Sequence, residues 1–183
     1  MNVLLTGKRQ VGKTAICKQV AELARGLGYD PAGVLTPVIL DEDGFPVVRH
    51  ALMVSDGQQR LLARTNGDLD GSRTGRYSFD AGVLSWVVER LRRAISQGCD
   101  LLIVDEIGPL ELEQGRGLAP ILSDLSGGRL PLLLLVVRSE LAGRLQKWLP
   151  GIPFRTFTVT QENRQALPTA IMKELFADHD RGR

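Results

Sequence analysis

Near the start of the chain the sequence reads Gly7-Lys8-Arg9-Gln10-Val11-Gly12-Lys13-Thr14. Two glycines that bracket four residues before a lysine and a threonine form the pattern of a phosphate-binding loop. The glycines allow a tight turn that points successive backbone N–H groups at phosphate oxygens. Lys13 adds a point charge for the β- and γ-phosphates, and the Thr14 hydroxyl is a ligand for Mg²⁺. We therefore predict that this whole run binds the phosphates of a nucleotide.

The residues around the loop support this interpretation. Residues 2–6 read as a short apolar strand, and residues 14–27 carry apolar side chains at helical spacing and stop at Gly28. A strand before the loop and a helix after it are the context that the motif requires, and the positive end of that helix adds fixed charge at the phosphates. The alternative, a glycine-rich turn with an exposed lysine, does not account for both flanking elements.

A second stretch ends in two acids. Residues 101–104 are a fully apolar strand, followed directly by Asp105 and Glu106. The carboxyl end of such a strand faces the same crevice as the loop, so we predict that Asp105 and Thr14 hold Mg²⁺. Glu106 is predicted to be the general base for an attacking water, with Lys13 as a second catalytic residue. Adjacent side chains on a strand point in different directions and can divide these roles.

The rest of the pattern predicts an α/β fold. Apolar strands alternate with amphipathic helices, which favours a three-layer sandwich with a mostly parallel sheet covered on both faces. Residues 32–40 and 46–54 flank the turn 41–44, which predicts one inserted β-hairpin, and the polar residues 64–78 are predicted to be an exposed loop. No linker or repeat interrupts the chain, so residues 1–183 are predicted to form a single phosphate-loop domain.

Later elements are predicted from cap residues and apolar runs. Strands are expected at residues 131–137 and 154–159. One helix is expected from Asp80 to about Gly98, and a short one between Gly117 and about Ser126. A third is expected from Ser139 to Trp148. The last is expected to be capped by Thr160 and to be interrupted or restarted at Pro168.

Composition restricts the class of protein. Hydrophobic residues make up 43% and charged residues 24% of the chain, as in ordinary soluble proteins. The formal net charge of +2 is too small to predict a nucleic-acid surface. The longest apolar run, residues 130–137, contains Pro131 and is far shorter than the ~20 residues of a membrane helix. With Cys17 and Cys99 as core thiols and no signal-peptide pattern at the start, we expect a cytoplasmic protein without a membrane or nucleic-acid partner. Whether the chain has a protein partner is left open by the sequence.

One octapeptide resembles a known family. Residues 105–112 read Asp-Glu-Ile-Gly-Pro-Leu-Glu-Leu and closely resemble the Asp-Glu-Ile-Gly-Pro-Met-Glu-Leu signature of the THEP-type nucleoside-triphosphatases. These small enzymes belong to the additional-strand class of phosphate-loop proteins. Weaker matches keep the family's order at residues 33–36, at residues 75–77 and at Thr160 with Asn163 and Arg164. In the family an acidic residue follows the threonine that matches Thr36, whereas this chain has Pro37.

The resemblance implies a RecA-like sheet and Mg²⁺-dependent hydrolysis of ATP, GTP and other nucleoside triphosphates with little base selectivity. Two other functions remain open at this stage. A small nucleoside, metabolite or polynucleotide kinase uses the same loop, and a non-catalytic adapter could bind nucleotide without turnover. The acids at positions 105 and 106 favour hydrolysis. An additional-strand hydrolase would have at least one strand between residues 2–6 and 101–104, whereas direct pairing of these two strands would favour a kinase.

Several other polar residues have two interpretations each. Glu111 either orders Mg²⁺-bound water or holds the shape of the signature loop. Arg76, Arg138 and Arg164 are each candidates for stabilising the γ-phosphate, and Arg138 follows a strand at the edge of the sheet where ligands bind. Asn163 with Arg164 either lines a base pocket or anchors the last helix.

Overall fold

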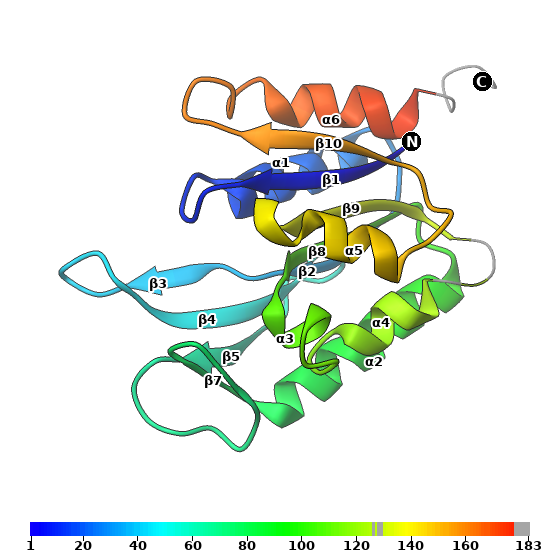
Figure 1. Cartoon of the computed structure of the whole chain (residues 1–183). Coiled ribbons are helices and arrows are strands. Elements are labelled where there is room, and N and C mark those ends of the chain that lie inside the picture. Colours follow the sequence, from blue (N-terminus) through cyan, green and yellow to red (C-terminus); the bar gives the residue numbers. More distant parts are fainter. Residues whose placement is uncertain (126, 128–129, 178–183) are drawn as a thin grey trace.

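One ten-stranded sheet organises the computed structural model, which describes residues 1–125, 127 and 130–177 (Figure 1). Its strand order is β10-β1-β9-β8-β2-β4-β5-β7-β6, and β3 pairs with β4. The parallel part consists of β1 (Asn2–Gly7), β2 (Pro31–Leu35), β8 (Leu101–Ile107), β9 (Leu132–Val137) and β10 (Phe154–Val159). The antiparallel part consists of β3 (Val38–Leu40), β4 (Pro46–Met53), β5 (Gln59–Arg64), β6 (Arg73–Thr74) and β7 (Tyr77–Phe79).

Helices cover both faces of the parallel part (Figure 1). One face is covered by α1 (Lys13–Gly26) and α6 (Leu167–Phe176). The other face is covered by α2 (Ala81–Gln97), α4 (Ala119–Asp124) and α5 (Ala142–Trp148), with two short helices beside them, α3 (Pro109–Leu112) and the 3₁₀ helix η1 (Ser139–Leu141). The predicted α/β three-layer sandwich is confirmed.

The central strands supply both hydrophobic cores. In β8, Leu102 packs into the core under α2 and α4, whereas Ile103 packs into the core under α1 and α6. This alternation explains why the sequence of a strand buried on both faces is apolar throughout. β2 comes close to β8 at Gly33, where a Cβ atom would lie 2.0 Å from the Ile103 carbonyl oxygen. Only glycine fits there, and its φ of 138° lies in a region that other residues rarely adopt.

β9 lies between β1 and β8 and is parallel to both. Leu134 of β9 pairs with Val3 on one side and with Ile103 on the other. The expected additional strand is therefore present, and β1 and β8 do not pair directly. The carboxyl ends of β1, β9, β8 and β2 share one edge of the sheet, which is where side chains and loops from different strands can form one site.

The antiparallel part differs from the sequence prediction. Residues 64–78 are not one exposed loop, because β6 and β7 lie within or at the end of this stretch, and β5 before it was not predicted. The strands β6 and β7 have only two and three residues, for which periodicity gives little signal, and they are defined by pairing, such as that of Ala63 with Phe79. The six residues of β5, Gln59–Arg64, do not alternate apolar and polar side chains. The predicted strand 32–40 is broken at Thr36 and Pro37 into β2 and β3.

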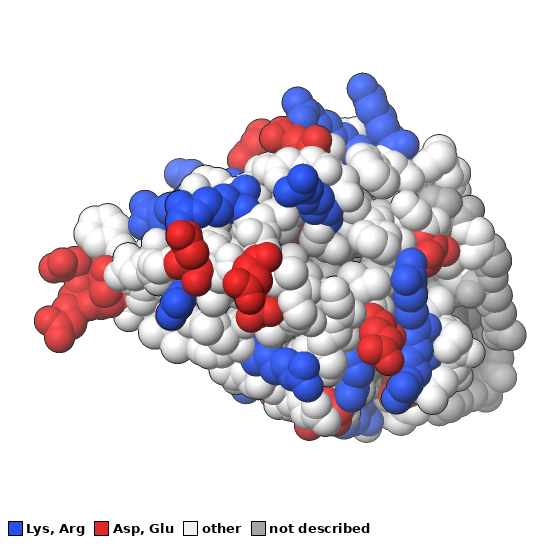
Figure 2. Space-filling view, turned by 90° about the horizontal axis from the view of Figure 1, so that it is seen from below, with Lys and Arg blue, Asp and Glu red and all other residues white. Residues whose placement is uncertain are grey.

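The β3–β4 hairpin projects beyond the parallel strands at the end where the phosphate loop lies (Figure 1). Its tip carries three exposed acids, Asp41, Glu42 and Asp43. Figure 2 shows acidic side chains gathered at this protruding end. Phe45 beside them is 57% exposed. The tip is therefore a solvated turn, and the part of the hairpin nearer the sheet is the part that can contribute to a site.

Of the predicted N-terminal helix caps, Asp80 is confirmed, whereas Ser139 and Thr160 differ from the prediction. Asp80 Oδ1 accepts a hydrogen bond from Val83 N at 2.8 Å and caps α2 as predicted. Ser139 begins a 3₁₀ turn rather than α5. Thr160 caps only a turn, and α6 begins later, with Pro168 in its first turn where a missing N–H is tolerated. α4 ends at Asp124, and the predicted end near Ser126 lies outside the described residues.

Among the described residues, no helix combines the length and the apolar sequence needed to span a bilayer.

Candidate active site

The phosphate loop joins β1 to α1 at the carboxyl edge of the sheet. Gly7 and Gly12 have φ angles of 139° and 110°, and a Cβ on Gly7 would lie 2.9 Å from the Val159 carbonyl oxygen. The loop therefore needs glycine at both places. α1 begins at Lys13 with neither a capping side chain nor an acidic residue in its first turn. The N–H groups and positive dipole end of this helix are thus arranged to receive an anion.

The Lys13 side chain folds back over the loop. Its Nζ donates to the carbonyl oxygens of Gly7 at 3.0 Å and Lys8 at 2.7 Å. Burial lowers the pKa of Lys13, while the negative charges of Glu106 and Asp105 oppose this shift. The ammonium is therefore held inside the loop, and Lys8, Arg9 and Gln10 remain exposed.

Asp105 lies near the carboxyl end of β8 and is only 2% exposed. Its Oδ2 accepts a hydrogen bond from Thr36 N at 3.2 Å. Burial raises the pKa of Asp105, and interactions with the Thr14 hydroxyl and the Thr36 N–H partly offset this rise. A carboxylate and a hydroxyl that face each other beside a phosphate loop provide the oxygen ligands that Mg²⁺ accepts, with phosphates and waters completing its shell. The side chains present therefore fit this cation.

Glu106 forms ion pairs with two arginines. Its Oε2 lies 3.2 Å from Arg49 Nη1, and its Oε1 lies 3.1 Å from Arg138 Nε. The Glu106 side chain is 15% exposed. Burial alone would raise the pKa of Glu106, but the charges of Arg49 and Arg138 together outweigh burial and lower it. Arg138 follows β9, so it lies between the ends of β1 and β8, as its place in the sequence suggested.

A cavity of about 80 Å³ adjoins Glu106 and is also lined by Arg49, Tyr77 and Arg138. A water molecule occupies about 30 Å³ in the liquid. The cavity therefore has room for water next to the predicted base. A larger surface groove of about 730 Å³, lined in part by Asp70 and Arg116, contains none of the predicted site residues.

Glu111 has both carboxylate oxygens engaged by the backbone of its own loop. Oε2 accepts from Gly108 N at 2.9 Å, and Oε1 accepts from Leu118 N at 3.2 Å. The side chain is buried, and burial raises its pKa. Of the two interpretations of Glu111, this geometry favours the one in which it holds the shape of the signature loop.

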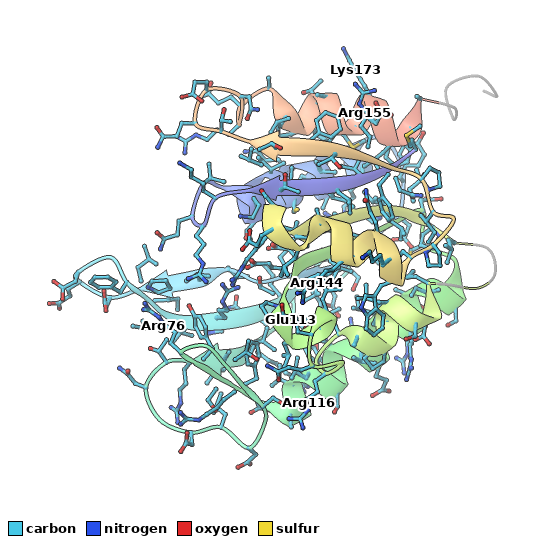
Figure 3. All side chains as sticks on the ribbon, in the orientation of Figure 1. Arg76, Glu113, Arg116, Arg144, Arg155 and Lys173 are labelled. Carbon is cyan, nitrogen blue, oxygen red and sulfur yellow. The ribbon has the colours of Figure 1, made fainter. Side chains whose placement is uncertain are left out.

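The other candidate residues, Arg76, Asn163 and Arg164, do not line the cavity next to Glu106. Arg76 is on the exposed turn between β6 and β7 (Figure 3), and Arg164 is exposed in the turns before α6. Asn163 Oδ1 accepts from Thr160 N at 2.9 Å, and its Nδ2 donates to Thr158 O at 2.9 Å. These contacts favour the interpretation that Asn163 anchors the segment before the last helix.

Sequence reasoning missed Arg49 and gave Tyr77 and Thr36 no role in the site. Arg49 comes from β4, and its guanidinium lies 5.0 Å from the centre of the Tyr77 ring. The one sequence signal for Arg49 is a charged residue in the middle of a mostly apolar strand. Thr36 contributes through its backbone N–H, which has no sequence signal at all. Their proximity to Glu106 and Asp105 follows from strand pairing.

Comparisons with known proteins identify the family of the chain. A family model described as NTPase matches residues 2–172. The protein named nucleoside-triphosphatase THEP1 of Thermofilum pendens is 31% identical over 175 residues, which cover 95% of this chain and 94% of that protein. The protein of the same name from Methanopyrus kandleri is 29% identical over 177 residues, which cover 95% of this chain and 94% of the relative.

Two solved structures have the same fold. The crystal structure of THEP1 from the hyperthermophile Aquifex aeolicus superposes with a TM-score of 0.72 at 18% identity and covers 96% of this chain and 99% of that chain. The solution structure of a human cancer-related nucleoside triphosphatase superposes with a TM-score of 0.69 at 21% identity and covers 97% of this chain and 98% of that chain. The family model and the sequence relatives confirm the resemblance of residues 105–112, and the chain belongs to the NTPase family.

Proposed function

We propose that this protein hydrolyses nucleoside triphosphates, including ATP and GTP, to nucleoside diphosphate and phosphate in a Mg²⁺-dependent reaction. The observation that carries the proposal is the position of Glu106, which follows Asp105 on β8 and lines a cavity with room for water. Membership of the NTPase family supports hydrolysis in general. The strand β9 between β1 and β8 favours a hydrolase over a kinase, because it is the arrangement expected of the additional-strand class.

Binding begins at the loop. The backbone N–H groups between Gly7 and Gly12 and the first turn of α1 receive the phosphate oxygens. Lys13 exchanges its contacts with the Gly7 and Lys8 carbonyls for contacts with the β- and γ-phosphates. Mg²⁺ held by Thr14 and Asp105 would offset negative charge on the same two phosphates. Thr36 keeps the Asp105 carboxylate oriented through its backbone N–H.

Hydrolysis then requires a water in line with the γ-phosphorus. Its oxygen forms a bond to phosphorus, the bond from phosphorus to the bridging β–γ oxygen breaks, and the diphosphate leaves. Glu106 takes the proton that the water loses. Arg138 lies between the loop and Glu106 in strand order, and its charge stabilises the γ-phosphate.

Base selectivity is proposed to be low, because every contact assigned above is made to phosphates or to the attacking water. The sequence also lacks the Asn-Lys-x-Asp signature that selects guanine.

Cytoplasmic localisation and the lack of a nucleic-acid partner remain proposals from the sequence.

Phosphate release without any added acceptor tests the function directly. We expect release from ATP, GTP, CTP and UTP with Mg²⁺, and none with excess EDTA. Asp105→Asn should need about 10- to 100-fold more Mg²⁺ for half-maximal rate, a typical loss when the groups around a metal are altered. Release that needs a nucleoside or metabolite acceptor would instead identify a kinase, and tight binding without release would identify an adapter.

A further inference from the structure

Arg49 reaches the site from the antiparallel part of the sheet, far from the phosphate loop in sequence. It pairs with Val38 of β3, so it lies beyond Leu35, where the parallel strand β2 ends. This position puts Arg49 on the wall formed by the hairpin, past the edge of the sheet where the loop opens. Its charge also acts on Lys13 and on Asp105. Arg49 is therefore within electrostatic range of the groups assigned to phosphate and to Mg²⁺.

The group formed by Arg49, Glu106 and Arg138 carries an excess of positive charge. Two guanidinium groups share one carboxylate, and each pair has a single close contact, at 3.2 Å for Arg49 and 3.1 Å for Arg138. A guanidinium has five N–H donors, so one carboxylate oxygen engages only part of each arginine. A γ-phosphate carries more negative charge than a carboxylate and can accept two parallel hydrogen bonds from one guanidinium.

The Tyr77 ring supports Arg49 without fixing it on Glu106. The guanidinium carbon is 5.0 Å from the ring centre, within the range of a cation–π interaction. A cation–π contact does not itself use an N–H donor, and among the described residues the buried Tyr77 hydroxyl has no hydrogen-bond partner, so the ring does not hold the guanidinium by a hydrogen bond. The Arg49 side chain is 18% exposed, so it borders solvent where a ligand can approach.

We propose that Arg49 exchanges partners during the reaction, leaving Glu106 for the γ-phosphate when a triphosphate binds. The exchange stabilises the charge of the γ-phosphate and at the same time frees Glu106 Oε2, the oxygen that Arg49 contacts, to accept a hydrogen bond from the attacking water. A diphosphate lacks the third phosphate and leaves Arg49 on Glu106. The base is thereby coupled to the presence of hydrolysable substrate. This inference rests on the proposed function, since it assigns a further residue to the same site.

A double-mutant cycle tests the exchange by binding rather than by turnover. The affinities of ADP and of the β,γ-imido analogue of ATP, both with Mg²⁺, are measured for the unsubstituted protein, Arg49→Gln, Glu106→Gln and the double variant. Because Glu106 competes for Arg49, Arg49→Gln should weaken analogue binding most in the Glu106→Gln background, by about 10-fold or more for one charged phosphate contact. With Glu106 present the loss should be smaller, and ADP affinity should change less than about 3-fold in every variant.

Other results would overturn the exchange. If Arg49 only neutralises Glu106, Arg49→Gln weakens analogue binding when Glu106 is present and has no effect in the Glu106→Gln background. Equal losses in both backgrounds would place Arg49 on the phosphate without competition from Glu106. Equal losses for ADP and the analogue would place Arg49 on a phosphate other than the third.

Two further variants guard against misfolding and nonspecific effects. Arg49→Lys keeps one charge and should give an intermediate loss of analogue affinity. Arg60→Gln is a matched control, because Arg60 on the neighbouring strand β5 also stacks on an aromatic ring, at 4.2 Å from Trp86, but is exposed. Its analogue affinity should be unchanged. Failure of the proposed function would appear in the unsubstituted protein as a lack of Mg²⁺-dependent phosphate release, whereas failure of the exchange leaves that release intact.

Discussion

The phosphate loop and the β3–β7 part of the sheet contribute to the same site in different ways. The loop is one continuous run from Gly7 to Thr14 that is proposed to bind phosphates through its backbone and needs glycine at positions of positive φ. The antiparallel part contributes single side chains, Arg49 and Tyr77, from strands that are brought together by pairing. Backbone recognition leaves a motif in the sequence, whereas recognition by single side chains does not.

This difference predicts that substitutions in the two regions reduce activity by unequal amounts, with the largest reduction for a substitution in the loop. Lys13→Ala should reduce kcat/KM for triphosphates by about 10²- to 10⁴-fold, because it removes charged contacts to two phosphates. Lys18→Ala, an exposed lysine on the same helix, is the control and should behave as the unsubstituted protein. Normal hydrolysis by Lys13→Ala would show that the loop is not the substrate site.

The two acids at the meeting point of the regions should affect stability in opposite directions at pH 7 without nucleotide or Mg²⁺. Burial raises the pKa of Asp105 in the folded state. The contribution of this group to the free energy of unfolding is therefore most favourable when the pH is below the pKa of the unfolded state, and it is lost as the pH rises through the pKa of the folded state. Asp105→Asn should therefore raise Tm. The pKa of Glu106 is lowered, so its contribution is present above the ordinary value of 4.5 and is lost as pH falls through the folded pKa.

Glu106→Gln should accordingly lower the free energy of unfolding by about 1–3 kcal/mol at pH 7, since it leaves Arg49 and Arg138 without their acidic partner. The effect should shrink as the pH falls through the lowered folded-state pKa and the carboxyl group becomes protonated. Urea denaturation of both variants across this pH range provides the measurement. Shifts of the same sign for both acids at pH 7 would contradict the opposite environments described for them.

Sequence reasoning was most successful where the signal is local or strongly periodic. The parallel strands and the Asp80 cap follow from apolar runs and cap chemistry, whereas the presence of a strand between β1 and β8 was expected from the family resemblance; the structure confirms them. The strand β7 was missed because it has only three residues, and β5 was missed because Gln59–Arg64 does not alternate apolar and polar side chains. Glu106 was predicted as a site residue from its place after an apolar strand, whereas its partner Arg49 is brought to it by strand pairing and was not predicted.

The smallest effect is expected at the hairpin tip. Phe45 is 57% exposed and lies among solvated acids, so Phe45→Ser should change the free energy of unfolding by less than about 0.5 kcal/mol and leave triphosphate affinity unchanged. Thermal unfolding and nucleotide titration check this. A marked loss of affinity would mean that the tip, and not only the Arg49 end of the hairpin, contacts the substrate.

The most direct test of the account is the rate of phosphate release by Glu106→Gln under single-turnover conditions, with triphosphate affinity measured on the same protein. Gln keeps the size of the side chain but cannot take the proton, so the rate should fall by about 10²- to 10⁴-fold while affinity is retained or increased. Glu113→Gln, which alters an exposed glutamate paired with Arg144 (Figure 3), should hydrolyse normally. Near-normal release by Glu106→Gln would contradict the assignment of Glu106 as the base.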